Sequence, residues 1–172
     1  MIEVDFSGLT KMNRTDSIIF KILEIRVKLI KQEKIMKVEI RQVDGLAMIG
    51  KGESNHWVVT DTAKIYKGHD AGTRPMELVL IALGGCAAMD IISLLRKKNA
   101  SLENLKVEID AEQAKDHPRV FTNIKANFIF YGKEVKEEDV EWAVNKTFEK
   151  YCPVAAMLAE ACEIDYSWQV LK

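Results

Sequence analysis

Cysteine, histidine and proline are scarce in this sequence: three of each occur in 172 residues, and no C-x-x-C or H-x-x-x-H pair is among them. An odd set of cysteines without a signal-peptide pattern argues against a secreted disulfide framework. The absence of closely spaced thiol and imidazole ligands argues against a zinc site. We therefore expect a cytoplasmic protein with free or catalytic thiols, no bound metal and no cofactor.

A large net charge of either sign is also missing. Lysine and arginine number 25 against 26 aspartates and glutamates, which leaves a formal charge of −1. Proteins that bind nucleic acid usually carry an excess of positive charge, so this class of function is disfavoured. Neither G-x-G-x-x-G nor a complete P-loop occurs, and no nucleotide is expected.

One long apolar run, residues 78–95, stands out from this balanced composition. It is about long enough to span a bilayer, but Asp90 lies near its middle and two consecutive glycines precede Cys86 inside it. A lone carboxylate at the centre of a membrane is costly. The run is therefore interpreted as a buried core helix, and no membrane partner is expected.

The first 35 residues differ from the rest. Ile18, Ile22 and Ile25 recur at helical spacing with charged residues between them, which predicts an amphipathic helix. We interpret residues 1–35 as an N-terminal extension. Its apolar stripe would pack on this subunit or on a neighbouring one, and binding to a membrane surface is the less favoured alternative.

Residues 36–172 alternate between strand and helix patterns and form the main domain. Asp44-Gly45 suits a two-residue hairpin turn, and Pro75 suits the first turn of the long helix. The expected order is three strands, a long helix, two strands, two helices and a final strand. Because the strands cluster in two groups, the pattern predicts an α+β fold rather than βαβ units. The helix expected at 137–151 has an apolar face made of Val140, Ala143, Val144, Phe148 and Tyr151.

Two of the three cysteines lie where a thiol could react. Cys152 precedes Pro153 and would be the N-cap of a short helix, where the helix dipole lowers a thiol pKa. Cys86 follows two glycines, whose missing side chains leave room for a ligand or a backbone to approach. Burial in the core is the alternative for both, and it is the interpretation of Cys162.

Asp90 follows Cys86 by one helical turn, so their side chains share a helix face. A carboxylate beside a thiol opposes formation of the thiolate unless a cation intervenes. Reactivity of Cys86 therefore requires a neutralising arginine. The sequence offers Arg41, Arg74 and Arg119 without choosing between them.

The motifs "GTRPMELVLIALGGCAAMD" and "KYCPVAAML", with "PRVFTNI" between them, resemble the OsmC/Ohr family, and the Gly-Gly-Cys form resembles its YhfA-like branch. The resemblance covers about residues 36–171. It implies an OsmC-like fold in which two sheets wrap around central helices in an intertwined homodimer, with active sites at the dimer interface.

The resemblance also implies a thiol-dependent peroxidase that reduces organic hydroperoxides. Carried over by motif, Cys86 attacks the hydroperoxide and becomes a sulfenic acid, and Cys152 resolves it as a disulfide. An external dithiol or a lipoyl-type reductant then restores the thiols. Glu77 and Arg41 are the expected activating residues, although Met76 holds the position where family peroxidases have their glutamate and the early segment "VDGLAMIGKGE" contains no arginine.

A second class of function stays open, a non-enzymatic protein that binds a small apolar ligand. The same interface cleft, lined by residues such as Met76, Met89 and Met157, would suit such a ligand because thioether side chains adapt to different shapes. A homodimer is expected under both hypotheses. A helix that is apolar on all sides needs more covering surface than this short chain offers.

Overall fold

The computed structural model describes residues 35–172. The N-terminal extension, with the amphipathic helix expected there, lies outside the described residues. Along the rest of the chain, the expected order of strands and helices is confirmed. The described residues fall into two compact units, 35–40 with 50–57 and 41–49 with 58–172.

The first three strands pair in chain order in one sheet: β1 (Glu39–Asp44), β2 (Ala47–Lys51) and β3 (Trp57–Thr60). A two-residue turn joins β1 to β2 as predicted, but it consists of Gly45 and Leu46 rather than Asp44 and Gly45, because Asp44 still belongs to β1. Gly45 has a φ of 53° there. Glycine adopts this left-handed backbone without a side-chain clash, which explains its place in the turn. Much of the apolar surface of these strands is exposed within the chain, including Ile40, Val43 and Trp57.

Asp61 organises the loop that follows β3 and contains the short 3-10 helix η1 (Lys64–Tyr66). The residue is 2% exposed. Its carboxylate accepts N–H groups from Ala71 at 3.1 Å, Thr62 at 2.7 Å and His69 at 2.9 Å. These hydrogen bonds, led by the one from Ala71, hold the pKa of Asp61 below its usual value against the opposing effect of burial.

Replacing Asp61 with asparagine is expected to lower the melting temperature by several degrees at pH 7, because one amide oxygen replaces two carboxylate oxygens. A carboxyl with a lowered folded-state pKa stabilises the protein above its unfolded pKa of about 3.9 and loses this contribution as pH falls through the folded value. Thermal melts should therefore show the gap between variant and wild type narrowing below about pH 4. Asp110→Asn, at an exposed position, is the control, and a gap that stays constant to low pH would contradict the assignment.

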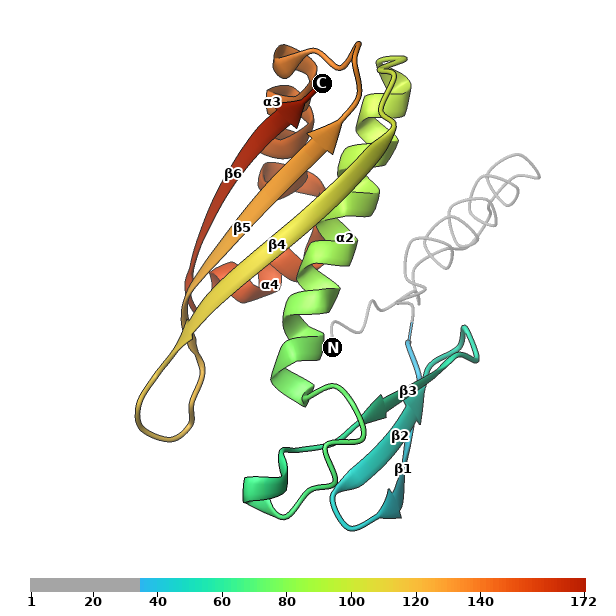
Figure 1. Ribbon diagram of the computed structural model, residues 1–172, viewed down its shortest axis with the longest axis vertical. Coiled ribbons are helices and arrows are strands. Elements are labelled where there is room, and N and C mark those ends of the chain that lie inside the picture. The colour runs from blue at the N-terminus through green and yellow to red at the C-terminus, as the bar shows by residue number, and fades with distance from the viewer. Residues whose placement is uncertain (1–34) are drawn as a thin grey trace, which may run out of the picture. The chain divides into compact units, whose positions relative to one another are not determined.

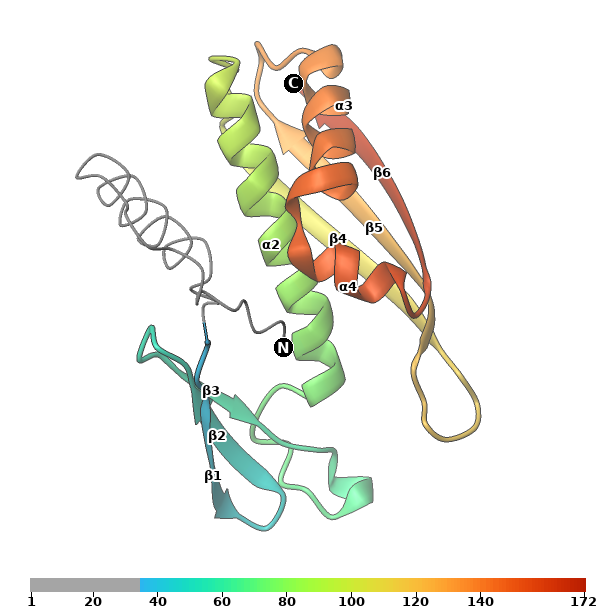
Figure 2. The same ribbon diagram turned by 180° about the vertical axis from the view of Figure 1, so that it is seen from behind.

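The second sheet carries the helices on one face (Figures 1 and 2). The helices are α2 (Pro75–Lys97), α3 (Glu137–Lys146) and α4 (Pro153–Ala159), and the strands are β4 (Asn104–Gln113), β5 (Phe121–Tyr131) and β6 (Glu163–Leu171). The predicted second hairpin is confirmed, because β4 and β5 pair antiparallel. By contrast, β5 and β6 are parallel and joined through α3 and α4, which adds one βαβ-type connection to the α+β fold.

The core of this unit lies between α2 and the sheet. By length and composition α2 could cross a bilayer, but Leu83, Ile91 and Leu95 of its inner side are buried in the core with Phe128 and Phe130 of β5. The long apolar run is thus a core helix within the described fold, as predicted.

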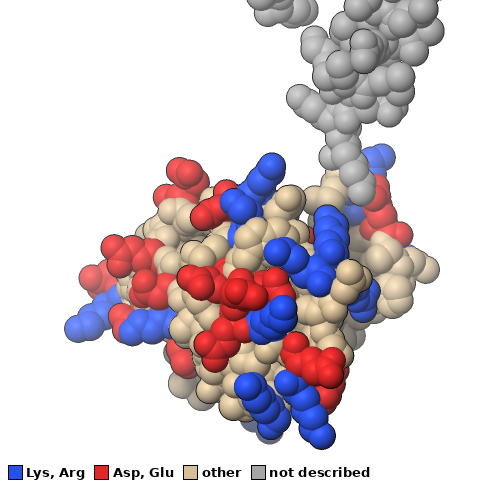
Figure 3. Space-filling view, turned by 90° about the horizontal axis from the view of Figure 1, so that it is seen from above, with Lys and Arg blue, Asp and Glu red and all other residues tan. Residues whose placement is uncertain are grey.

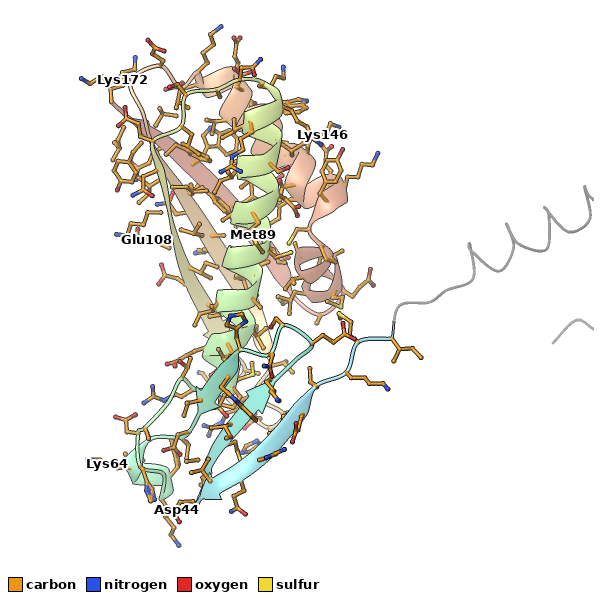
Figure 4. All side chains as sticks on the ribbon, turned by 90° about the vertical axis from the view of Figure 1, so that its right-hand side faces the viewer. Asp44, Lys64, Met89, Glu108, Lys146 and Lys172 are labelled. Carbon is orange, nitrogen blue, oxygen red and sulfur yellow. The ribbon has the colours of Figure 1, made fainter. Side chains whose placement is uncertain are left out.

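The other side of α2 is apolar and exposed. Ile81, Gly85 and Met89 follow each other at intervals of four residues, so they form one stripe along the helix. Met89, which is 68% exposed, lies midway along α2 (Figure 4). Charged residues are distributed differently: Figure 3 shows acidic and basic side chains interspersed on one face of the molecule, without a zone of a single sign.

Candidate thiol site

Cys86, Asp90 and Cys152 come together in the structure. Their two sulfur atoms and a carboxylate oxygen all lie within 4.8 Å of one another. Cys86 and Asp90 occupy consecutive turns of α2, as the sequence predicted, and Cys152 comes from the start of α4, which packs against α2. All three cysteines of the chain are free thiols. Such a set could also hold one metal ion, which the spacing of cysteines and histidines did not indicate.

Cys152 is the N-cap of α4, as predicted, and its Sγ accepts the N–H of Ala155 at 3.4 Å. The π-helical segment η2 (Thr147–Tyr151) leads into it. The N–H of Cys152 donates to the carbonyl oxygen of Thr147 at 2.9 Å, five residues back, which is the hydrogen bond of a π-helical turn. This wider turn sets the direction in which the chain enters α4 and hence the place of the sulfur.

The π-helical segment also explains one difference from the predicted apolar face of this helix. Val140, Ala143 and Val144 are buried as expected, but Tyr151 is 44% exposed. The prediction assumed 3.6 residues per turn throughout. A turn that closes after five residues rotates Tyr151 out of the apolar face.

The predicted lowering of the Cys152 pKa is wrong in sign. The residue is 2% exposed, and desolvation raises the pKa of its thiol to about 11, with a smaller upward contribution from Cys86. The N–H groups of Ala155 and Val154 act in the opposite direction without reversing the shift. Burial therefore outweighs the helix dipole, and Cys152 is a neutral thiol at neutral pH.

Asp90 is half-buried, and it has neither a hydrogen bond nor an ion pair with any of residues 35–172. Arg41 lies exposed on β1, and Arg119 lies exposed before β5. Within residues 35–172, none of the arginines that the sequence offered forms an ion pair with Asp90. Three groups that can each carry negative charge therefore meet without an ion pair from this part of the chain.

Glu77 is paired with Arg74. Its carboxylate accepts the backbone N–H of Arg74 at 2.9 Å and a guanidinium N–H at 3.1 Å, and these bonds, led by the first, lower the pKa of Glu77. Arg74 also bonds Asp70 at 3.1 Å. The R-x-x-E spacing at the start of a helix is a capping box and could have identified this partner from sequence. Cys86 lies nine residues further along α2, about 13.5 Å along the axis, so the pair does not reach it within one chain.

An apolar groove of about 540 Å³ lies beside the outer stripe of α2. Its lining residues are Glu77, Leu80, Ile81, Gly84, Gly85, Ala88, Val107 and Ile109. A Cβ atom at Gly84 would lie 3.0 Å from Ile109 Cδ1, so this glycine lets α2 pack closely on β4. A Cβ atom at Gly85 would meet nothing within 4 Å. Of the two glycines that precede Cys86, only Gly85 therefore leaves open space at its own position.

The three methionines considered for a ligand cleft are not among the residues that line this groove. Met76, Met89 and Met157 are all exposed. Within residues 35–172 of one chain, these three side chains are therefore exposed to solvent and do not contribute to the lining of the groove.

Comparison with known proteins places this geometry in a family. The family model for OsmC-like protein matches residues 68–167. Protein YhfA of Escherichia coli K12 is 36% identical over 136 residues, which cover 79% of this chain and 98% of YhfA. A hypothetical protein from Aquifex aeolicus is similar in structure, with a TM-score of 0.72 and 26% identity over 80% of this chain and 97% of its own.

A more distant structure shares the fold. An organic hydroperoxide resistance protein OsmC from Legionella pneumophila has a TM-score of 0.63 at 14% identity and covers 81% of this chain and 100% of its own. The family model spans more than half of the chain, and the YhfA match extends over most of it. The chain therefore belongs to the family of OsmC-like proteins.

Proposed function

We propose that the protein is a thiol-dependent peroxidase that reduces organic hydroperoxides through Cys86 and Cys152. The observation that carries this proposal is the approach of the two sulfur atoms to within 4.8 Å in the reduced protein. The Cys86 thiolate attacks one oxygen of the hydroperoxide, the O–O bond breaks, and an alcohol leaves as Cys86 becomes a sulfenic acid. The Cys152 thiol then displaces water to form a disulfide, which an external dithiol or lipoyl-type reductant reduces.

The burial of the two thiols supports a division of roles. Cys86 is half-buried, so a small substrate can approach it, whereas Cys152 is almost fully buried with its pKa raised to about 11. A neutral, inaccessible thiol reacts poorly with peroxide, because the thiolate is the nucleophile. Cys152 is instead proposed to react with the sulfenic acid formed beside it, and its proton leaves with the sulfenic oxygen as water when the S–S bond forms. The apolar groove next to the outer stripe of α2 suits the organic part of a hydroperoxide.

This chemistry is proposed to operate in a cytoplasmic homodimer. The outer stripe of α2 and the apolar side chains of β1 to β3 are too extensive to remain open to water in a soluble protein. A second copy is proposed to cover them. It also brings a cation to Cys86: Arg41, and Glu77 with its partner Arg74, are proposed to act on the thiol of the other subunit.

Reversible binding of a small apolar ligand is the second candidate function. The 540 Å³ groove favours it, because the groove lies within the size range of small-molecule sites and almost all of its lining residues are apolar. Ligand binding leaves the thiols unchanged, whereas peroxidase chemistry consumes them. The fate of the cysteines in peroxide therefore separates the two functions.

One equivalent of cumene hydroperoxide is expected to convert Cys86 and Cys152 into one disulfide within a chain and to leave Cys162 reduced. The short distance between the first two sulfur atoms makes their reaction faster than any between chains. Mass spectrometry of tryptic peptides and a non-reducing gel would identify the bond. A sulfinic acid at Cys86 beside reduced Cys152 would contradict the two-cysteine cycle, and three unmodified thiols would favour ligand binding.

A further inference from the structure

We propose that Cys86, Asp90 and Cys152 form a binding site for one thiophilic divalent cation, with Zn²⁺ as the physiological example. The two sulfur atoms and the carboxylate oxygen come from two helices that pack against each other. The site goes beyond the peroxidase proposed above, because it needs neither a hydroperoxide nor a change in the oxidation state of sulfur.

The distances suit a metal of this kind. A point between three atoms that are at most 4.8 Å apart lies within ~2.8 Å of each, and Zn²⁺ prefers about 2.3 Å to thiolate sulfur and about 2.1 Å to carboxylate oxygen. Inward movements of about half an ångström complete the contraction. Cys86 and Asp90 are one helical turn apart, so both can turn toward one ion without a change in the backbone.

The nature of the three ligands favours a soft cation over calcium or magnesium. Thiolate sulfur prefers zinc and other thiophilic metals, whereas calcium and magnesium require oxygen ligands. Three protein ligands leave the fourth position of a tetrahedral ion for water or a small ligand. The N–H of Ala155 bonds Cys152 Sγ at 3.4 Å and fixes the direction of this sulfur from the side of α4.

The charge of the site points to a cation independently of the distances. The carboxylate of Asp90 is half-buried and unpaired among residues 35–172, and Arg74 is occupied by Asp70 and Glu77. A divalent ion binding here would displace one proton from each thiol into solvent. Its two positive charges would then face two thiolates and one carboxylate. Because the site is partly desolvated, the electrostatic attraction between the ion and these ligands is strong.

The proposal predicts competition between metal and oxidation. A bound cation occupies both sulfur atoms that a hydroperoxide would convert into a disulfide, and the disulfide in turn removes two of the three ligands. Metal-loaded protein should therefore lose its thiols to hydroperoxide at least about tenfold more slowly than metal-free protein. Protein oxidised beforehand should bind no cation at this site.

Titration of the reduced full-length protein with Co²⁺ alone, without oxygen, tests the site. A sulfur-to-cobalt charge-transfer band should saturate at one ion per chain, with the visible bands of tetrahedral Co²⁺, and Zn²⁺ should displace the signal. Asp90→Asn should weaken the affinity for Co²⁺ at least about tenfold, and Cys86→Ser should remove about half or more of the charge-transfer intensity. Cys162→Ser is the matched control and should titrate like the wild type.

The folding of each variant is checked apart from its binding of Co²⁺, and circular dichroism confirms that Asp90→Asn and Cys86→Ser are folded. Cys152 is buried, so its substitution would disturb the core. Protein with a preformed Cys86–Cys152 disulfide is therefore used in place of a Cys152 variant. Absence of the band in reduced wild type, a band that survives in folded Cys86→Ser at full intensity, or a band that Cys162→Ser removes would overturn the site. The cobalt titration uses no peroxide, and the peroxidase assay uses protein treated with a chelator. The metal site and the peroxidase function are therefore tested independently, and either can fail without affecting the test of the other.

Discussion

Replacing Cys86 with serine is expected to lower kcat/KM for cumene hydroperoxide at least about a thousandfold, down to the rate of the reaction without protein. A hydroxyl cannot replace the thiol here, because it forms no thiolate at neutral pH and no sulfenic acid that a second thiol could resolve. Turnover would be followed as loss of hydroperoxide in the presence of dithiothreitol or a lipoyl-type dithiol.

Cys162→Ser supplies the matched control for this experiment. Cys162 is partly buried, and its thiol donates to the carbonyl oxygen of Leu158 at 3.5 Å, so a serine hydroxyl can keep the same hydrogen bond. The control should turn over at the wild-type rate. Undiminished turnover in Cys86→Ser would remove the peroxidase assignment, and loss of turnover in both variants would indicate a general effect of removing a thiol.

Replacing Met89 with glutamate is expected to weaken the proposed homodimer by about a hundredfold or more in its dissociation constant. Met89 belongs to the exposed stripe and lies midway along α2, where a symmetric interface would bury the new charge twice. An unpaired charge in an interface costs several kcal/mol. Sedimentation velocity across a range of concentrations would detect the shift from dimer to monomer.

Gln169→Glu is the control for the dimer prediction, because it adds the same single charge at an exposed position of β6. It should sediment like the wild type. A wild-type protein that is a folded monomer at micromolar concentration would contradict the dimer directly. A dimer that Met89→Glu leaves unchanged would show that the stripe on α2 is not part of the interface.

Features that depend on neighbouring residues could be predicted from the sequence. Pro75 marks the start of α2, Gly45 lies in the first hairpin turn, and Cys152 caps α4, because each effect acts within one turn of the chain. The same holds for Cys86 and Asp90, whose spacing of four residues places them on one helix face.

Features that depend on distant parts of the chain could not be predicted in this way. The parallel pairing of β5 with β6 requires α3 and α4 to lie between them in the chain, and strand patterns contain no information on direction. The pKa of Cys152 depends on how many atoms cover it, and this desolvation exceeds the local effect of the helix dipole. The meeting of Cys152 with Asp90 follows from packing of α2 on α4 and has no sequence spacing that would indicate it.

The π-helical segment before Cys152 makes the paired thiols tolerant of a change in chain length. It accommodates one residue more than an α-helical turn would hold between the same points. Deleting a single residue there would let the segment close as an ordinary α-helical turn between those points, so that α4 and Cys152 would keep their places beside α2. A relative that has lost one residue between Thr147 and Cys152 would therefore differ in the spacing of its two cysteines in an alignment and still bring the thiols together in space.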